Sequence, residues 1–198
     1  MGVAGLPAGG TIGYRDDWSP EAHGGRLRRF QGYYSTPGAR AVCHAAKQQA
    51  DMALRDEAIR TMARHLSRRL MMGDLVDLGA VPAWLVPAPQ HHGRADYTLR
   101  IASLVAAETG AQVLDILRCD PHEPLYEQKL RGVGTGGVRL WLAGDMPPGG
   151  VPLLVDNVIG TGLTFLLADR LLGGRALPLV FAVDYGRVDA GLVRRGIV

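Results

Sequence analysis

The sequence has little cysteine and no long apolar run. Its 198 residues contain two cysteines, Cys43 and Cys119, which match no metal-ligand spacing. We expect reduced thiols, and a disulfide between them stays open. No apolar run approaches the ~20 residues that span a bilayer, and the first residues lack the basic start and apolar stretch of a signal peptide. We therefore expect a cytoplasmic protein without a membrane partner.

Internal repeats and long low-complexity tracts are also missing. A chain of 198 residues with 47% hydrophobic and 21% charged residues has the composition of a single globular domain. The formal net charge of +3 suits an anionic small molecule or a nucleic acid and does not choose between them. Homodimers are the commonest oligomers, so a homodimer is the assembly to test first.

The N-terminal part differs in composition from the rest. Residues 1–38 are rich in glycine, proline and charge, which predicts a loop-rich segment with a short strand near residues 30–34. Residues 39–198 are expected to form the α/β domain. Within it, apolar residues recur every four or eight positions from 40 to 72, which predicts one helix. Its charged face is interpreted as solvated, and a nucleic-acid contact is the less favoured alternative.

Short apolar runs then alternate with helical patterns. Such runs predict a parallel sheet covered on both faces, and the fold class is therefore α/β with a doubly wound, mainly parallel sheet. The expected strands cover residues 84–86, 113–117, 138–142, 151–155 and 177–183, the expected helices cover 97–108 and 162–172, and 118–137 is expected to be irregular.

The clearest strand, residues 151–155, ends in the polar pair Asp156-Asn157. A turn of small residues, Gly160-Thr161-Gly162-Leu163-Thr164, leads into the next helix. Unpaired N–H groups and the helix dipole make such a turn a site for an anion, most naturally a phosphate. The carboxylate just before it suits sugar hydroxyls or a magnesium ion. The segment therefore predicts a phosphorylated ribose as ligand.

The same stretch, LLVDNVIGTGLT, resembles the phosphoribosyl-pyrophosphate (PRPP) motif of type I phosphoribosyltransferases. That resemblance implies the fold of this family, with a small N-terminal hood, and magnesium as cofactor. It implies that Asp156 and Asn157 are the catalytic pair that meets the ribose hydroxyls, with Asp156 on the metal. The 5′-phosphate would be held by Gly160, Thr161, Gly162, Leu163 and Thr164.

A second segment agrees with the first. Residues 85–94, LVPAPQHHGR, resemble the pyrophosphate loop of the family, and the Val-Pro-x-Pro form is similar to its ComF-like branch, which is linked to DNA uptake. Residues 117–131 are similar to the family's mobile loop. The resemblance assigns pyrophosphate to Ala88, Pro89, Gln90, His91, Arg94, Lys129 and Arg131. For the last two, a purely solubilising role is an equal alternative.

One departure from the motif divides the functional hypotheses. Asn157 stands where the family has a second acid, and an amide can bond a hydroxyl but cannot act as a base. The first hypothesis is an enzyme that binds PRPP with magnesium and transfers phosphoribose to a nitrogen nucleophile such as a nucleobase. The second is a non-catalytic sensor or regulator of the same fold, linked to DNA uptake or processing.

Other motifs have ordinary alternatives. Asp184 and Tyr185 follow the last strand, where they are expected either to recognise a substrate base or only to end the strand. The pair His91-His92 is poor metal-ligand geometry, so exposed or phosphate-facing rings are preferred. Residues 132–137 match G-x-G-x-x-G, but no strand precedes them and no helix follows. The PRPP-like stretch itself has the alternative of a plain strand–turn–helix capped by Thr161.

Overall fold

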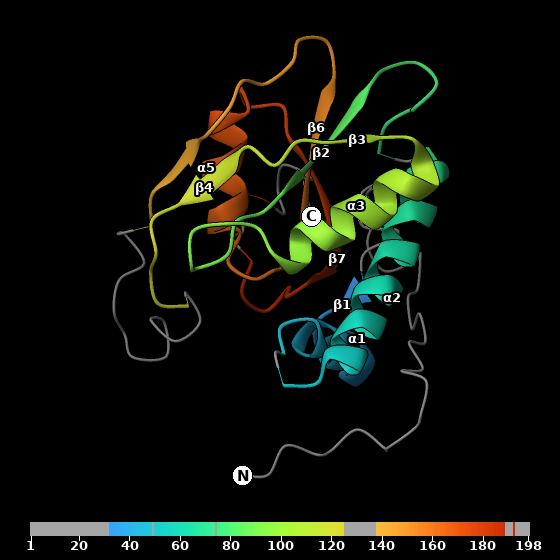
Figure 1. Ribbon diagram of the computed structural model, residues 1–198, viewed down its shortest axis with the longest axis vertical. Coiled ribbons are helices and arrows are strands. Elements are labelled where there is room, and N and C mark those ends of the chain that lie inside the picture. The colour runs from blue at the N-terminus through green and yellow to red at the C-terminus, as the bar shows by residue number, and fades with distance from the viewer. Residues whose placement is uncertain (1–31, 49, 74, 125–137, 189–191, 193–198) are drawn as a thin grey trace.

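The computed structural model describes residues 32–48, 50–73, 75–124, 138–188 and 192. Within these residues, five strands form one parallel sheet in the order β1-β7-β6-β2-β3 (Figure 1). The strands are β1 (Gly32–Tyr33), β2 (Ala83–Pro87), β3 (Gln112–Val113), β6 (Val151–Ile159) and β7 (Leu177–Val183). The expected α/β class with a mainly parallel sheet is confirmed, and β7 has the predicted bounds.

Helices cover both faces of this sheet. Figure 1 shows α5 (Leu163–Leu171) on one side and α2 (Met52–Met71) and α3 (Tyr97–Thr109) on the other. Side chains alternate between the faces of a strand. Accordingly, Leu153 of β6 is buried in the core cluster under α2 and α3, while Leu154 is buried in the cluster around Phe165 of α5. The result is a three-layer α/β arrangement with a separate apolar core on each side of the sheet.

The sheet reverses its order between β2 and β6. The chain leaves β2 through α3 and reaches β3 at one end of the sheet. It leaves β6 through α5 and reaches β7 on the opposite side. In open α/β sheets, the crevice beyond the carboxyl ends of two such strands is the usual position of a ligand site. The topology therefore marks the loops that follow β2 and β6.

The predicted single helix over 40–72 is wrong. The chain forms α1 (Pro37–Ala45) and then starts again at α2 (Met52–Met71). The Asp51 carboxylate accepts the N–H of Leu54 at 2.9 Å, and such a side-chain cap is typical of a helix start. The spacing of apolar residues continues across the break because both helices bury one face in the same core.

The predicted strand over 113–117 is also wrong, because the chain changes sheets there. The N–H of Leu114 still donates to the carbonyl of Leu85 at 2.9 Å, at the edge of the parallel sheet. The chain then enters β4 (Leu117–Cys119), which pairs antiparallel with β5 (Leu140–Leu142). The expectation of irregular chain over 118–137 is therefore wrong for residues 118–119, and residues 125–137 lie outside the described part.

The proposed boundary at residue 38 falls inside α1. The short strand expected near residues 30–34 is confirmed as β1, and it pairs with β7 through Gly32 and Ala182. The last residues of the expected hood segment thus belong to the main sheet, while residues 1–31 lie outside the described part. None of the helices in the described ranges is long and apolar enough to cross a membrane.

The contact of Gly150 with Trp84 gives a test of the packing at the start of β6. A Cβ at Gly150 would collide with the indole ring of Trp84, which is buried. We expect Gly150→Ala to lower the free energy of unfolding by about 1–3 kcal/mol, the usual cost of overpacking. Urea denaturation measures this. Gly186→Ala is the control, since its Cβ would only touch Asp184 Oδ1 at 3.5 Å. Equal stability of the two variants would contradict the packing.

Candidate functional site

The polar pair of the PRPP-like stretch lies inside β6, not after it. The strand was expected to end at Val155, but it continues to Ile159, and its last residues pair with β7 alone. Its pairing with β2 stops at Pro87 and Val155. Asp156 and Asn157 therefore lie just beyond the end of β2, at the point where the sheet reverses its order.

Asn157 is buried, with 1% of its surface exposed, and its amide joins three elements. Its Oδ1 accepts the hydroxyl proton of Tyr97 from α3 at 3.1 Å. Its Nδ2 donates to the carbonyl of Cys43 in α1 at 3.3 Å. A carboxylate accepts hydrogen bonds but has no proton to donate. Asparagine suits this position because its amide can both accept and donate a hydrogen bond. The predicted contact with ribose stays a prediction.

Asp156 has a carboxyl group with unusual acidity. Burial raises its pKa to about 6, although the charge of Lys47 and the N–H of Asn157, 2.7 Å from Oδ1, act in the opposite direction. A pKa in this range suits a group that takes up or releases a proton near neutral pH. Around it, burial raises the pKa of the Cys43 thiol to about 12 and that of the Tyr97 hydroxyl well above its ordinary value, so both stay protonated.

The loop after β6 has the geometry expected of an anion site. Gly162, the residue before α5, has φ of 86°, and a Cβ there would collide with Leu192. Glycine is therefore required on two grounds. The Thr161 hydroxyl accepts a hydrogen bond from the N–H of Leu163 at 3.4 Å. This contact agrees with the alternative in which Thr161 only caps the helix. The described residues offer no acceptor to the N–H groups of Thr164 and Phe165, which remain as donors at the helix start.

The loop after β2 has fewer available donors than expected. The N–H of Ala88 donates to Val155 at 2.9 Å and that of Gln90 to Arg94 at 3.0 Å, while Pro89 has no N–H. These contacts hold the loop in a closed turn against β6. Of the residues assigned to pyrophosphate, Ala88, Pro89 and Gln90 therefore offer no free main-chain N–H. The exposed side chain of Arg94 is the remaining strong donor of this loop.

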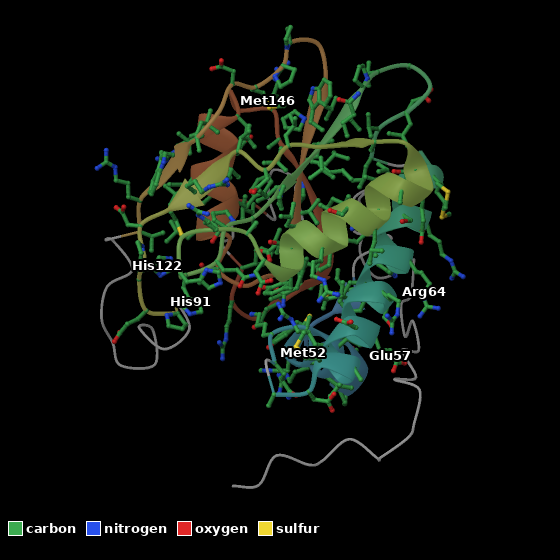
Figure 2. All side chains as sticks on the ribbon, in the orientation of Figure 1. Met52, Glu57, Arg64, His91, His122 and Met146 are labelled. Carbon is green, nitrogen blue, oxygen red and sulfur yellow. The ribbon has the colours of Figure 1, made fainter. Side chains whose placement is uncertain are left out.

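Histidines gather where this loop meets the chain after β4. The carbonyl of His91 accepts the N–H of His122 at 2.8 Å, and the rings of His91 and His92 lie 5.5 Å apart. Figure 2 shows His91 and His122 near each other, on the opposite side of the molecule from Arg64. No group of three or more His, Cys, Asp or Glu side chains among the described residues is arranged to hold a metal ion.

The residues predicted to recognise a base lie beside the end of β6. The N–H of Asp184 donates to the carbonyl of Ile159 at 2.9 Å, and its carboxylate pairs with Arg187 at 3.5 Å. Tyr185 packs partly buried against the core cluster under α5. The structure thus brings Asp184 and Tyr185 to the same edge as Asp156. Lys129 and Arg131, the other predicted pyrophosphate ligands, lie outside the described residues.

Sequence reasoning missed Lys47. This exposed side chain follows α1, and its charge lowers the pKa of the Asp156 carboxyl against the larger effect of burial. The sequence placed Lys47 on the solvated face of a long helix. Its position depends on where α1 ends and on how Cys43 packs against Asn157. No local pattern carries that information.

The comparisons with known proteins give no family. Neither a scan against models of protein families nor a search of curated proteins finds a match for this sequence.

The raised pKa of Asp156 predicts a pH-dependent stability. The protonated carboxyl is favoured by the folded state, so its contribution is fully present below about pH 4 and is lost as pH rises through about 6. Asp156→Asn removes this ionisation. We expect the free energy of unfolding of the variant to exceed that of the wild type by about 1–3 kcal/mol at pH 7 and to match it near pH 4. Urea denaturation between pH 4 and 7.5 measures the difference, and a constant difference would contradict the burial of this carboxyl.

Asn157→Asp tests the buried amide. The new carboxylate would face the Cys43 carbonyl without a proton to donate, so we expect a loss of about 1–3 kcal/mol in unfolding free energy at pH 7.5. Protonation would restore a donor, so the loss should shrink toward pH 5. Thr109→Ala, far along α3, is the control. An unchanged stability at pH 7.5 would mean that this amide is not the link between β6 and α1.

Proposed function

We propose that the protein binds PRPP with magnesium where the sheet reverses its order, and transfers phosphoribose to a nitrogen nucleophile. The observation that carries this proposal is the meeting of two loops. The PRPP-like stretch and the pyrophosphate-like loop are separate in the sequence. The first covers the end of β6 and the turn after it, the second follows β2, and these two neighbouring strands flank the reversal. This is the fold-level position of a ligand in open α/β sheets.

The 5′-phosphate would bind at the start of α5. Main-chain N–H groups of Thr164 and Phe165 have no acceptor among the described residues, and Gly162 lets the backbone come close. Helix starts attract phosphate through such amides and through the helix dipole. The hydroxyls of Thr161 and Thr164 add donors. The ribose hydroxyls would then lie toward Asp156, one strand end away from the loop after β2.

The residues fit a magnesium ion only if the substrate shares in binding it. Asp156 is the carboxylate of the PRPP-like stretch, and the described residues contain no cluster that would hold a metal by itself. Magnesium is usually bound by one or two carboxylates together with substrate phosphates and water. Asp156 would therefore hold the ion jointly with pyrophosphate oxygens. When bound, the ion would supply positive charge to the leaving group.

The transfer requires little covalent chemistry from the protein. The bond between ribose carbon 1 and pyrophosphate breaks, its electron pair leaves with pyrophosphate, and the nitrogen nucleophile forms the new bond. A nucleophile that carries a proton must pass it to a base. Because Asp156 would be ionised and occupied in holding the magnesium ion, the proton would pass to solvent water. The protein's main contributions would be to position the two substrates and to stabilise charge.

A non-catalytic PRPP or nucleotide sensor is the second candidate. Two observations favour it. The amide of Asn157 is committed to Tyr97 and Cys43, so the pair contributes one carboxylate instead of two. The N–H groups of Ala88 and Gln90 already donate to carbonyl groups of the protein, which leaves fewer donors to bind pyrophosphate. Calorimetry with PRPP and magnesium, followed by a pyrophosphate-release assay over a panel of nitrogen bases, separates the candidates. Binding without release would favour the sensor, and no binding would contradict both.

The threonines of the loop after β6 provide the sharper test. We expect Thr161→Ala and Thr164→Ala each to weaken PRPP binding by about 1–2 kcal/mol, the scale of a hydrogen bond to a charged group. Thr109→Ala is the matched control, since its hydroxyl bonds to Val105 within α3 at 2.8 Å. Calorimetry of all four proteins at fixed magnesium measures the effect. Equal affinity of the loop variants and the control would exclude this loop as the phosphate site.

A further inference from the structure

Helix α1 and the turn that follows it present a row of basic side chains at the carboxyl edge of the sheet. Arg40, His44 and Lys47 follow one another at spacings of four and three, and all three are exposed. The opposite face of the helix carries Val42 and Cys43, which are buried in the core. The row therefore lies on the outward side of a helix that is fixed against β6. We call these three residues the α1 basic row.

Tyr34 attaches the α1 basic row to the end of β7. Its N–H donates to the carbonyl of Val183 at 3.1 Å, and its hydroxyl lies 3.1 Å from Nε2 of His44. The guanidinium of Arg40 lies over its ring, 5.4 Å from the centroid. A cation stacked on an aromatic ring is held in a defined position. Arg40 is thus oriented beside the strand end that carries Asp184.

The α1 basic row spans the distance between the two parts of the candidate site. At one end, Lys47 acts electrostatically on Asp156, where the ribose would lie. At the other end, the pKa of Tyr34 is raised by burial and then by Cys43, lowered by Arg40, and raised again by Asp184. Lys47 thus lies by Asp156, and Arg40 lies by Tyr34, which is close enough to Asp184 to be affected by its charge. In the proposed site, the acceptor nitrogen would approach ribose carbon 1 across this interval.

The side chains of the α1 basic row form no ion pair with a carboxylate of the described residues. Asp184 is already paired with Arg187. Among the described residues, no ion pair includes Arg40 or Lys47. His44 adds no charge at neutral pH, because burial, Lys47 and Arg40 all lower its pKa. Arg40 therefore has no carboxylate partner in the described part of the protein, and Lys47 acts on Asp156 without forming an ion pair with it.

We propose that the acceptor is a nitrogen compound that carries a carboxylate, which Arg40 and Lys47 bind. A guanidinium presents two parallel donors to a carboxylate, and an ammonium adds a point charge. The inference rests on the proposed function, since it names the class of the second substrate at that site. A neutral base would offer neither cation an anionic partner. The α1 basic row would thus select the acceptor, and the loops after β2 and β6 would bind PRPP.

Matched pairs of probes test this selection. Nicotinate is compared with nicotinamide, and orotate with uracil, by calorimetry with and without PRPP and magnesium. We expect each carboxylate to bind at least tenfold more tightly than its neutral partner. Arg40→Gln and Lys47→Gln should each weaken carboxylate binding about tenfold, the scale of one charge-assisted hydrogen bond, and should not change the neutral compounds. Arg40→Lys should keep part of the affinity.

The controls separate this inference from the proposed function. Arg64→Gln removes an exposed arginine of α2, on the outer side of the molecule in Figure 2, and should change no affinity. Unchanged thermal unfolding shows that the variants are folded. Failure of PRPP to bind would contradict the proposed function, while carboxylate binding without PRPP would still support the α1 basic row. Equal affinity for the members of each pair, no binding of either carboxylate, or an equal loss for the neutral compounds would overturn the inference.

Discussion

The buried amide of Asn157 is the contact on which the arrangement of this edge depends. Its Oδ1 accepts a hydrogen bond from the Tyr97 hydroxyl at the start of α3, and its Nδ2 donates one to the carbonyl of Cys43 in α1. Burying a polar group without a hydrogen-bond partner costs free energy, so these two hydrogen bonds restrict how α1, α3 and β6 pack together. With the amide satisfied, α1 lies over the end of β6, and Lys47 lies near Asp156. The structure therefore gives Asn157 a role in joining these elements, and its predicted contact with ribose stays a prediction.

Much of the sheet was predictable because its strands are buried on both faces. Continuous apolar runs identified β2, β6 and β7, and the helical pattern before Gly110 identified α3. The failures share one cause. The end of β6, the break before α2 and the division between β3 and β4 are set by partners distant in sequence, namely β7, the common core and β5. The spacing of apolar residues along a short segment carries no information about partners that are distant in the sequence.

The geometry of the candidate site was predictable only where the sequence pattern is local, and its ligand stays a prediction. The turn before α5 could be located because glycine and threonine at a strand-to-helix junction have a local meaning, and Gly162 indeed requires φ above zero. The hydrogen bonds of Ala88 and Gln90 could not be predicted, since their acceptors lie on β6 and across the loop. The effect of Lys47 on Asp156 could not be predicted, because it depends on how α1 packs against the end of β6.

The charge of Asp156 connects the fold to the proposed ligand. A fixed carboxylate beside phosphates would repel them, and the proposed PRPP site would have to reduce that repulsion. Two features would do so: burial raises the pKa of the carboxyl to about 6, and Lys47 supplies a nearby positive charge. A nearby anion favours the protonated carboxyl, while a cation bound together with the substrate favours the ionised one. The protonation of Asp156 is therefore coupled to what binds beside it. Because Asn157 fixes both β6 and α1, the same buried amide that stabilises the edge also sets this coupling.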